Sequence, residues 1–179
     1  KNKNYFQNCI DPEKILPNKN WFKNFEKIWL PDEENALKTL NNFIKNKIIN
    51  YSEGRNYPNI SGTSKLSPYI KFGQIHVETI WDECKKNKTK TIGTSKFLAE
   101  IGWREFNHSL INHFPHMTKN NYSKKFDKFP WKKNNKFLNA WKKGLTGYPI
   151  VDAGMRELYS IGWMHNRVPM IVASFLTKN

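Results

Sequence analysis

The sequence predicts an all-α fold. In several stretches apolar residues recur every three or four positions, which is the spacing of one face of an α-helix. No stretch alternates apolar and polar residues with the period of two that is typical of a half-buried strand, and no internal repeat is visible. With 179 residues, the chain is long enough for one ordinary domain with an apolar core.

Residues 1–35 are expected to form a lead-in or linker segment that packs on another part of the protein. They carry three prolines among Lys and Asn, with isolated apolar anchors at Trp21, Phe22, Phe25 and Trp29. The helical domain is then expected over 36–179. Its first helix should begin near Ala36 and end near the loop at 52–58, because apolar residues follow helical spacing at Leu37, Leu40, Ile44 and Ile48. A second helix is expected from about 74 to 86.

Four further helices are expected in the second half of the chain. The segment 95–114 is apolar or aromatic around most of its circumference, which indicates a helix buried inside a bundle. A short helix follows a Lys-rich excursion, with apolar positions at Trp131, Phe137, Leu138 and Trp141. Pro149 suits the first turn of a helix over 150–161, which Gly162 ends. A final helix is expected over 163–176.

The chain is strongly basic. Thirty Lys and Arg residues against fifteen Asp and Glu residues give a formal charge of +15, which favours a nucleic-acid partner. The alternative is a solvated background, because Lys, Asn and Ile are all abundant, as AT-rich coding would produce. No run approaches the roughly 20 apolar residues of a membrane span, and the first thirty residues lack the apolar centre of a secretory signal. We therefore expect a soluble, cytoplasmic, DNA-associated monomer with no membrane partner.

Cysteine and histidine spacing predicts neither a disulfide framework nor a metal site. Cys9 and Cys84 are far apart and belong to no CxxC pattern, and the five His residues lack metal-ligand spacing. Arginine is more informative, because only four of the thirty basic residues are Arg, each in a distinctive local motif: Arg55, Arg104, Arg156 and Arg167. A planar guanidinium kept in a Lys-rich chain suggests bidentate contacts with phosphate or carboxylate.

One face of the predicted helix over 95–114 combines charges with aromatic residues. At about 100° per residue, four side chains fall within about a quarter of the circumference, with Trp103 beside them: Phe97, Glu100, Arg104 and Asn107. This face could form a functional site. The structural alternative is a buried ion pair between Glu100 and Arg104, four residues apart and surrounded by core aromatics.

Two further segments have polar groups in positions that suit binding. The turn at 62–68 places hydroxyls and backbone N–H groups ahead of a helix, where they could hold a phosphate, although such turns are usually helix caps, with Ser67 as the capping candidate. In the final predicted helix, one face would carry an indole, an amide, a guanidinium and a thioether, from Trp163, Asn166, Arg167 and Met170. Trp and Met at helical spacing are more often core residues, but the amide and guanidinium suggest a recognition surface.

Four segments resemble signatures of the DNA photolyase and cryptochrome family, in the order in which that family carries them. They are YSEGRNYP at 51–58, GTSKLSPYIKFG at 62–73, FLAEIGWREF at 97–106 and GYPIVDAGMRELYSIGWMHNR at 147–167. The resemblance covers about residues 20–179 and is closest to class I cyclobutane pyrimidine dimer (CPD) photolyases. It implies an all-helical FAD-binding domain that admits a flipped-out pyrimidine dimer, which light-excited reduced FAD splits by electron transfer. The partner would be damaged DNA.

The resemblance also implies roles for particular residues. FAD would be held by Tyr51, Thr63, Ser64, Lys65, Leu66, Ser67, Phe97, Arg104, Trp163 and Asn166. The chemistry at the dimer would involve Glu100, Trp103, Trp163, Asn166 and Met170, with Glu100 hydrogen-bonding the dimer and stabilising its radical anion. DNA contacts would come from Arg55, Glu100, Trp103, Asn107, Asn166 and Arg167. Trp131 matches the outer end of a tryptophan chain that passes electrons to flavin, whose inner members would follow residue 179.

The sequence departs from the family pattern in three ways. It lacks the antenna-binding α/β domain that normally precedes this region, so an antenna chromophore is expected only if the native protein has that domain. It also lacks the segment that follows Leu176 in relatives, so 36–179 is expected to be a partial FAD-binding domain. Pro169 stands where relatives commonly carry Arg.

Three functions therefore stand as hypotheses. The first is a CPD photolyase, a carbon–carbon lyase, which Glu100 and the Trp163–Asn166 motif favour. The second is a cryptochrome-like blue-light sensor. The third is an inactive basic fragment that binds DNA.

Overall fold

The computed structural model describes residues 21–86 and 91–178, and every regular element within them is a helix. The all-α prediction is confirmed. The α-helices are α1 (Lys23–Glu26), α2 (Glu33–Asn46), α3 (Tyr51–Gly54), α4 (Ser67–Lys71), α5 (Val77–Lys86), α6 (Ile92–His113), α7 (Asn135–Lys142), α8 (Pro149–Ile161) and α9 (Arg167–Lys178). Short 3-10 turns are η2 (Ile48–Asn50), η3 (Pro115–Thr118) and η4 (Lys124–Phe126).

Side-chain caps explain why α2 and α6 begin about three residues earlier than expected. The carboxylate of Asp32 accepts a hydrogen bond from the backbone N of Asn35 at 2.7 Å, and Thr91 Oγ1 accepts one from the backbone N of Thr94 at 3.1 Å. Each cap satisfies an N–H group that has no partner inside the helix. Because the first turns of both helices are mostly polar, the spacing of apolar residues does not reveal where these helices begin.

Two of the later helices begin after the expected positions. The side chain of Asn134 caps α7, so Trp131 lies before that helix rather than inside it. The final helix begins at Arg167, so Trp163 and Asn166 lie in the connection between α8 and α9. The prediction that both share a helical face with Met170 is therefore wrong. Gly162 ends α8 with a φ of 70°, as expected of a glycine that terminates a helix.

The larger of two apolar cores joins α2 and η2 to α3–α6. Its buried side chains are Ala36, Leu40, Phe43, Ile44, Ile48, Tyr51, Leu66, Tyr69, Ile75, Ile80, Cys84, Phe97 and Ile101. The start of α6 lies against η2 at Gly93, where an added Cβ would come within 1.9 Å of the carbonyl oxygen of Ile48. This close approach brings Phe97 into the core.

A second, smaller core joins α8 to α9. It consists of Val151 and Met155 on α8 and Val168 and Val172 on α9. The helices approach closely at Gly154, where an added Cβ would lie 2.3 Å from a methyl carbon of Val168.

Among the described residues before α2, Trp21 and Trp29 contact α8. The indole N–H of Trp29 donates a hydrogen bond of 2.7 Å to the carbonyl of Ile161, and the ring of Trp21 stacks on Tyr159. These contacts tie the smaller core to the larger one. Residues 1–20, with Cys9, lie outside the described residues.

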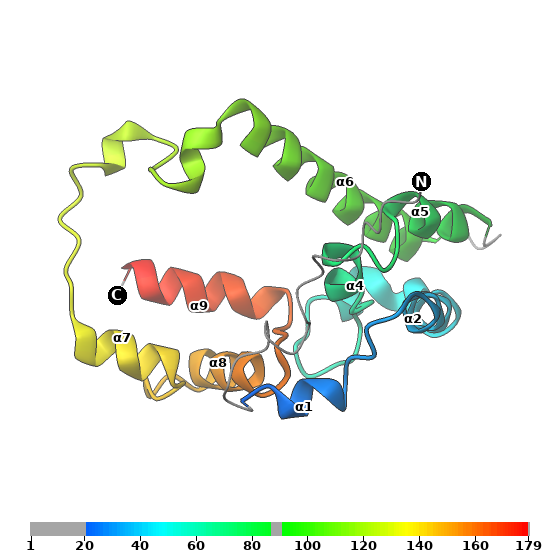
Figure 1. The fold of residues 1–179 in the computed structure, drawn as a ribbon, viewed down its shortest axis with the longest axis horizontal. Helices are drawn as coiled ribbons and strands as arrows, with labels where there is room; N and C mark the ends of the chain where they lie inside the picture. Colours follow the sequence, from blue (N-terminus) through cyan, green and yellow to red (C-terminus); the bar gives the residue numbers. More distant parts are fainter. Residues whose placement is uncertain (1–20, 87–90, 179) are drawn as a thin grey trace, which may run out of the picture.

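Between α6 and α7 the chain runs in a wide arc away from both cores (Figure 1). Several aromatic side chains along it are about half exposed: Tyr122, Phe126, Phe129 and Trp131. None of the helices in the described ranges combines the length and apolar content needed to cross a membrane.

The contact at Gly93 generates a stability prediction. Gly93→Ala should destabilise the protein by about 1–3 kcal/mol, because the new methyl group would collide with rigid backbone. Gly102→Ala, in the same helix with no atom within 4 Å of the new Cβ, should instead stabilise it by roughly 0.5–1 kcal/mol. Urea unfolding of both variants measures the difference, and equal effects would contradict the packing described.

Candidate functional site

A cavity of about 340 Å³ lies where α3, α6, the turn at 63–67 and the connection between α8 and α9 meet. We call it the central cavity. Its lining residues are Tyr51, Arg55, Thr63, Ser64, Lys65, Leu66, Ser67, Ile70, Phe97, Glu100, Ile101, Arg104, Trp163, Met164, Asn166 and Pro169. Every residue that the sequence analysis assigned to FAD binding is among them. Segments more than a hundred residues apart in sequence thus build one site.

The turn at 63–67 is held in place by backbone geometry. Lys65 has a φ of 55°, in the left-handed region that side chains rarely adopt. Just before it, Gly62 lies so close to Gly54 that an added Cβ would come within 2.5 Å of the Gly54 carbonyl oxygen. Leu66 anchors the turn in the larger core with an exposed fraction of 1%. The hydroxyls of Thr63 and Ser64 are thereby brought to the cavity wall.

Ser67 does not cap α4, contrary to the structural alternative considered for this turn. It is the first residue of the helix, the capping position belongs to Leu66, and no side chain caps this end. Within the turn, Ser64 Oγ accepts a hydrogen bond of 3.4 Å from the backbone N of Leu66. Ser67 itself is exposed and lines the central cavity.

A buried ion pair crosses the cavity wall between Arg55 and Glu100. Nη1 of Arg55 contacts a carboxylate oxygen of Glu100; the guanidinium is 4% exposed and the carboxylate side chain 29%. The expected pair between Glu100 and Arg104 is wrong, because Arg104 contacts the neighbouring Glu105. Helix α3 brings Arg55 to Glu100 from a segment 45 residues earlier, which helical spacing within α6 does not reveal.

The ion pair sets the charge state of the cavity. The hydrogen bond and charge of Arg55 lower the pKa of Glu100 against the opposing effect of burial. Glu100 in turn raises the pKa of Arg55. Glu100 is therefore ionised at neutral pH, and an ionised carboxylate accepts hydrogen bonds but donates none.

Aromatic rings form the wall beside this pair. The ring centroids of Tyr51 and Phe97 lie 5.3 Å apart at an angle of 85°, and the guanidinium carbon of Arg55 lies 5.4 Å from the centroid of Tyr51. Burial raises the pKa of Tyr51, which keeps its hydroxyl protonated. On the opposite side, Nζ of Lys65 lies 5.0 Å from the ring centroid of Trp163. Aromatic and cationic groups therefore surround one space.

The connection that carries Trp163 and Asn166 is fixed by His165. This side chain is buried, with an exposed fraction of 3%, and its Nδ1 accepts a hydrogen bond of 3.3 Å from the backbone N of Arg167. Burial lowers the pKa of His165, so the imidazole is neutral. Sequence reasoning missed this residue because a lone histidine carries no spacing signal.

Two of the predicted DNA contacts are engaged inside the protein. Arg55 is buried in the ion pair, out of reach of a surface phosphate, so its expected role is corrected. Arg167 is half-buried, and its Nε and Nη2 donate hydrogen bonds of 3.1 Å and 2.6 Å to the side-chain oxygen of Asn56. This contact ties the start of α9 to the residues after α3.

Four other predicted residues lie outside the central cavity. Trp103 and Asn107 line an adjoining hollow of about 300 Å³ together with Glu100 and Arg104, so α6 connects the two spaces. Met170 is 64% exposed and does not line the cavity, because α9 begins later than expected. Trp131 lies on the arc between α6 and α7.

The lining residues suit a ligand that combines an aromatic ring with phosphate. The hydroxyls of Thr63, Ser64 and Ser67, together with Lys65 and Arg104, offer donors to an anion, and Glu100 is the only acidic residue among the described residues that line the wall. Nε of Arg55 is buried with no hydrogen-bond partner among the described residues, so a donor remains available there. The described part of the chain contains no cluster of His, Cys, Asp or Glu residues that could hold a metal ion. The fold and cavity together define a helical nucleotide-binding domain.

Comparison with known proteins identifies the family. Residues 97–179 match the model for the FAD binding domain of DNA photolyase. A deoxyribodipyrimidine photo-lyase from Agrobacterium fabrum is 46% identical over 93% of this chain and 35% of its own length. Cryptochrome-2 from Arabidopsis thaliana is 38% identical over 84% of this chain and 26% of its own. The chain belongs to the DNA photolyase and cryptochrome family.

Solved structures agree with this assignment. The crystal structure of a bacterial class III photolyase from Agrobacterium tumefaciens superposes with a TM-score of 0.88, at 45% identity over 93% of this chain and 35% of the other. An archaeal photolyase from Sulfolobus tokodaii, described with two FAD molecules, gives 0.71 at 34% identity over 83% of this chain and 32% of the other. The chain thus spans about a third of the length of these relatives. The first of them is described as class III, whereas the sequence motifs suggested class I.

The ion pair generates a second stability prediction. Arg55→Met and Glu100→Gln should each destabilise the protein by about 1–3 kcal/mol, because each leaves a charge with no partner at a partly dry site. The two changes together should cost less than their sum by about 1 kcal/mol or more. Urea unfolding at neutral pH of the two single variants and the double variant measures this coupling, and strictly additive costs would show that the pair is not formed.

The same coupling should depend on pH. Because the folded pKa of Glu100 is depressed, the stability that the pair contributes is present above the pKa of an unfolded Glu, about 4.3, and is lost as pH falls through the lower folded pKa. The stability difference between the native protein and Glu100→Gln should therefore shrink as the pH falls below about 4.

Proposed function

We propose that the central cavity is part of an FAD site and that the protein carrying this chain repairs cyclobutane pyrimidine dimers in DNA with light. The observation that carries the proposal is the convergence of the family's motif residues on one cavity, whose wall combines hydroxyls, cations and aromatic rings. The relatives named deoxyribodipyrimidine photo-lyase support the reaction.

The turn at 63–67 and helix α6 would both contact the FAD phosphates. Thr63, Ser64 and Lys65 would hold the phosphates and ribityl chain of FAD, and Arg104 would neutralise their charge from the facing helix. Tyr51 and Phe97 would exclude water beside the flavin ring. Bound in its reduced form, FAD supplies the light-driven electron that splits the dimer.

Glu100 would meet the lesion rather than the cofactor. The resemblance implies a hydrogen bond from its carboxyl group, but the ion pair with Arg55 keeps the carboxylate ionised and therefore an acceptor. Glu100 would thus accept a hydrogen bond from the imide N–H of a flipped-out pyrimidine. Trp103, in the adjoining hollow that Glu100 also lines, and Trp163 would stack on the lesion.

A cryptochrome-like light sensor is the second candidate, because relatives named cryptochromes are 38% identical to the chain. The sensor would bind FAD in the same cavity and signal to a partner without repairing DNA. Light-dependent loss of pyrimidine dimers from DNA by the full-length protein distinguishes the two. Flavin binding with no dimer loss would favour the sensor. If the protein neither binds flavin nor removes dimers, the hypothesis of an inactive basic DNA-binding fragment would remain.

We predict that Glu100→Gln, in the full-length protein, lowers the yield of dimer splitting per bound flavin about tenfold, because a neutral amide is a weaker acceptor in a dry site. Flavin content should fall far less than the splitting yield. Glu78→Gln, an exposed change outside the cavity, is the matched control. Loss of flavin with a normal repair yield per flavin would show that Glu100 serves only to neutralise Arg55.

DNA binding should weaken steeply with salt, because the charge of +15 implies many phosphate contacts. Arg167 would contact a DNA phosphate, so Arg167→Ala should weaken binding to damaged and undamaged DNA alike. The slope of the logarithm of the binding constant against the logarithm of the salt concentration should become shallower by about one. Asn56→Ala releases the guanidinium without removing it, so binding should be retained. Unchanged binding in Arg167→Ala would remove this residue from the DNA interface.

A further inference from the structure

A second polar cleft, of about 430 Å³, lies between α2 and the turn that follows residue 60. Its lining residues are Asn35, Lys38, Thr39, Asn42, Phe43, Lys47, Ser61, Ser64 and Lys65. We call it the lysine cleft. Three ammonium-bearing side chains line it, with hydroxyl and amide groups between them, and no carboxylate is among the lining residues. Neither the family motifs nor the proposed repair reaction assigns Lys38, Lys47 or Ser61 a role.

Lys47 is the fixed cation of the lysine cleft. Its Nζ donates a hydrogen bond of 3.0 Å to Ser61 Oγ, which bridges the end of α2 and the turn. Partial burial, and then the charge of Lys65, lower the pKa of Lys47. Among the described residues no carboxylate forms an ion pair with Lys47, so the hydroxyl of Ser61 is a neutral partner that leaves the ammonium charge uncompensated.

The other two lysines already have partners at the edges of the lysine cleft. Lys38 forms an exposed ion pair with Glu34 at 2.7 Å, one turn earlier on α2. Lys65 directs its ammonium group to the ring of Trp163 in the central cavity. Lys47 therefore remains as the cation with hydrogen-bonding capacity toward a ligand. Thr39 and Asn42, on the same face of α2, add neutral donors beside it.

We propose that the lysine cleft binds a phosphate group, with Lys47 as its principal cation and Ser61 as the residue that positions it. A tetrahedral anion matches a set of ammonium, hydroxyl and amide donors, and the nearby carboxylates of Glu34 and Asp32 are engaged by Lys38 and Asn35 rather than by Lys47. The phosphate could belong to a nucleic-acid backbone or to a free phosphate compound. Ser64 and Lys65 line both this cleft and the central cavity, so a bound phosphate would lie next to the proposed cofactor site. The proposal stands on this geometry and not on repair activity.

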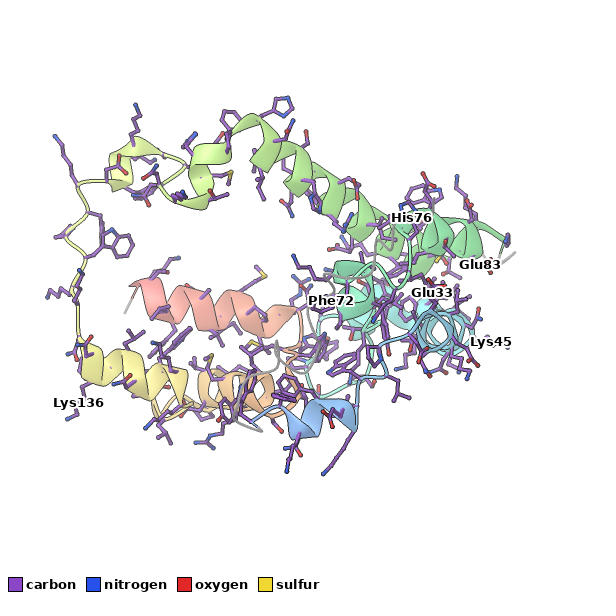
Figure 2. All side chains as sticks on the ribbon, viewed as in Figure 1. Glu33, Lys45, Phe72, His76, Glu83 and Lys136 are labelled. Atoms are coloured by element: carbon purple, nitrogen blue, oxygen red, sulfur yellow. The ribbon has the colours of Figure 1, made fainter. Side chains whose placement is uncertain are left out.

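The test uses inorganic pyrophosphate as the probe and the full-length protein in the dark. Lys47→Gln should weaken pyrophosphate binding about tenfold, measured by calorimetry at constant ionic strength, because it removes a charge-assisted hydrogen bond. Lys45→Gln is the matched control, because it removes the same charge from the outer face of α2, in the last turn before Lys47 (Figure 2). Lys47→Arg should restore most of the affinity. Equal binding by Lys47→Gln and Lys45→Gln would overturn the proposal.

A competition arm identifies the source of the phosphate. Single-stranded oligothymidylate that displaces pyrophosphate from the native protein, and binds less tightly to Lys47→Gln than to Lys45→Gln, would assign the lysine cleft to a DNA strand. Retention of pyrophosphate in the presence of the oligonucleotide would assign it to a free phosphate compound. Ser61→Ala, which keeps every charge, should also weaken pyrophosphate binding. Unchanged affinity in both Ser61→Ala and Lys47→Gln would contradict the site, whatever the repair activity.

Discussion

The ion pair between Arg55 and Glu100 is the constraint on which the rest of the site depends. Burying a charged guanidinium that is 4% exposed costs free energy unless it has a partner, and the carboxylate on α6 is that partner. The contact links α6 to the residue after α3, on the wall of the cavity that Phe97, Ile101 and Arg104 also line. Because it keeps Glu100 ionised, the same interaction sets the chemistry available in the cavity.

The second half of the chain completes that cavity through a few polar contacts rather than through a shared apolar core. The bond between Arg167 and Asn56 joins the start of α9 to the residues after α3, and Trp29 joins the lead-in to the end of α8. Buried His165 then holds the connection that carries Trp163 and Asn166. The site is thus assembled from parts that belong to two separate cores.

The fold class was predictable from the sequence, and so were the residues assigned to FAD binding that line the central cavity, because helical periodicity and ordered family motifs are local signals. The helix boundaries were harder to predict from the sequence. Side-chain caps at Asp32 and Thr91 lengthen two helices at their N-terminal ends. Trp163 and Asn166 lie in the connection between α8 and α9 instead of in a helix. Partners across the fold could not be predicted. Glu100 pairs with Arg55, although Arg104 has the spacing of a partner on the same helix, and Arg167 binds Asn56, 111 residues away. The lysine cleft likewise depends on a turn and a helix that meet only in three dimensions.

The central claim is that the central cavity holds a flavin nucleotide. Its most direct test is the visible absorption spectrum of the full-length protein after incubation with FAD and gel filtration, beside the Arg104→Ala variant. The account predicts flavin absorption that elutes with the native protein and is strongly reduced in the variant, because Arg104 lines the same cavity as the turn at 63–67 and would neutralise the FAD phosphates. A native protein that is helical by circular dichroism yet retains no flavin would contradict it.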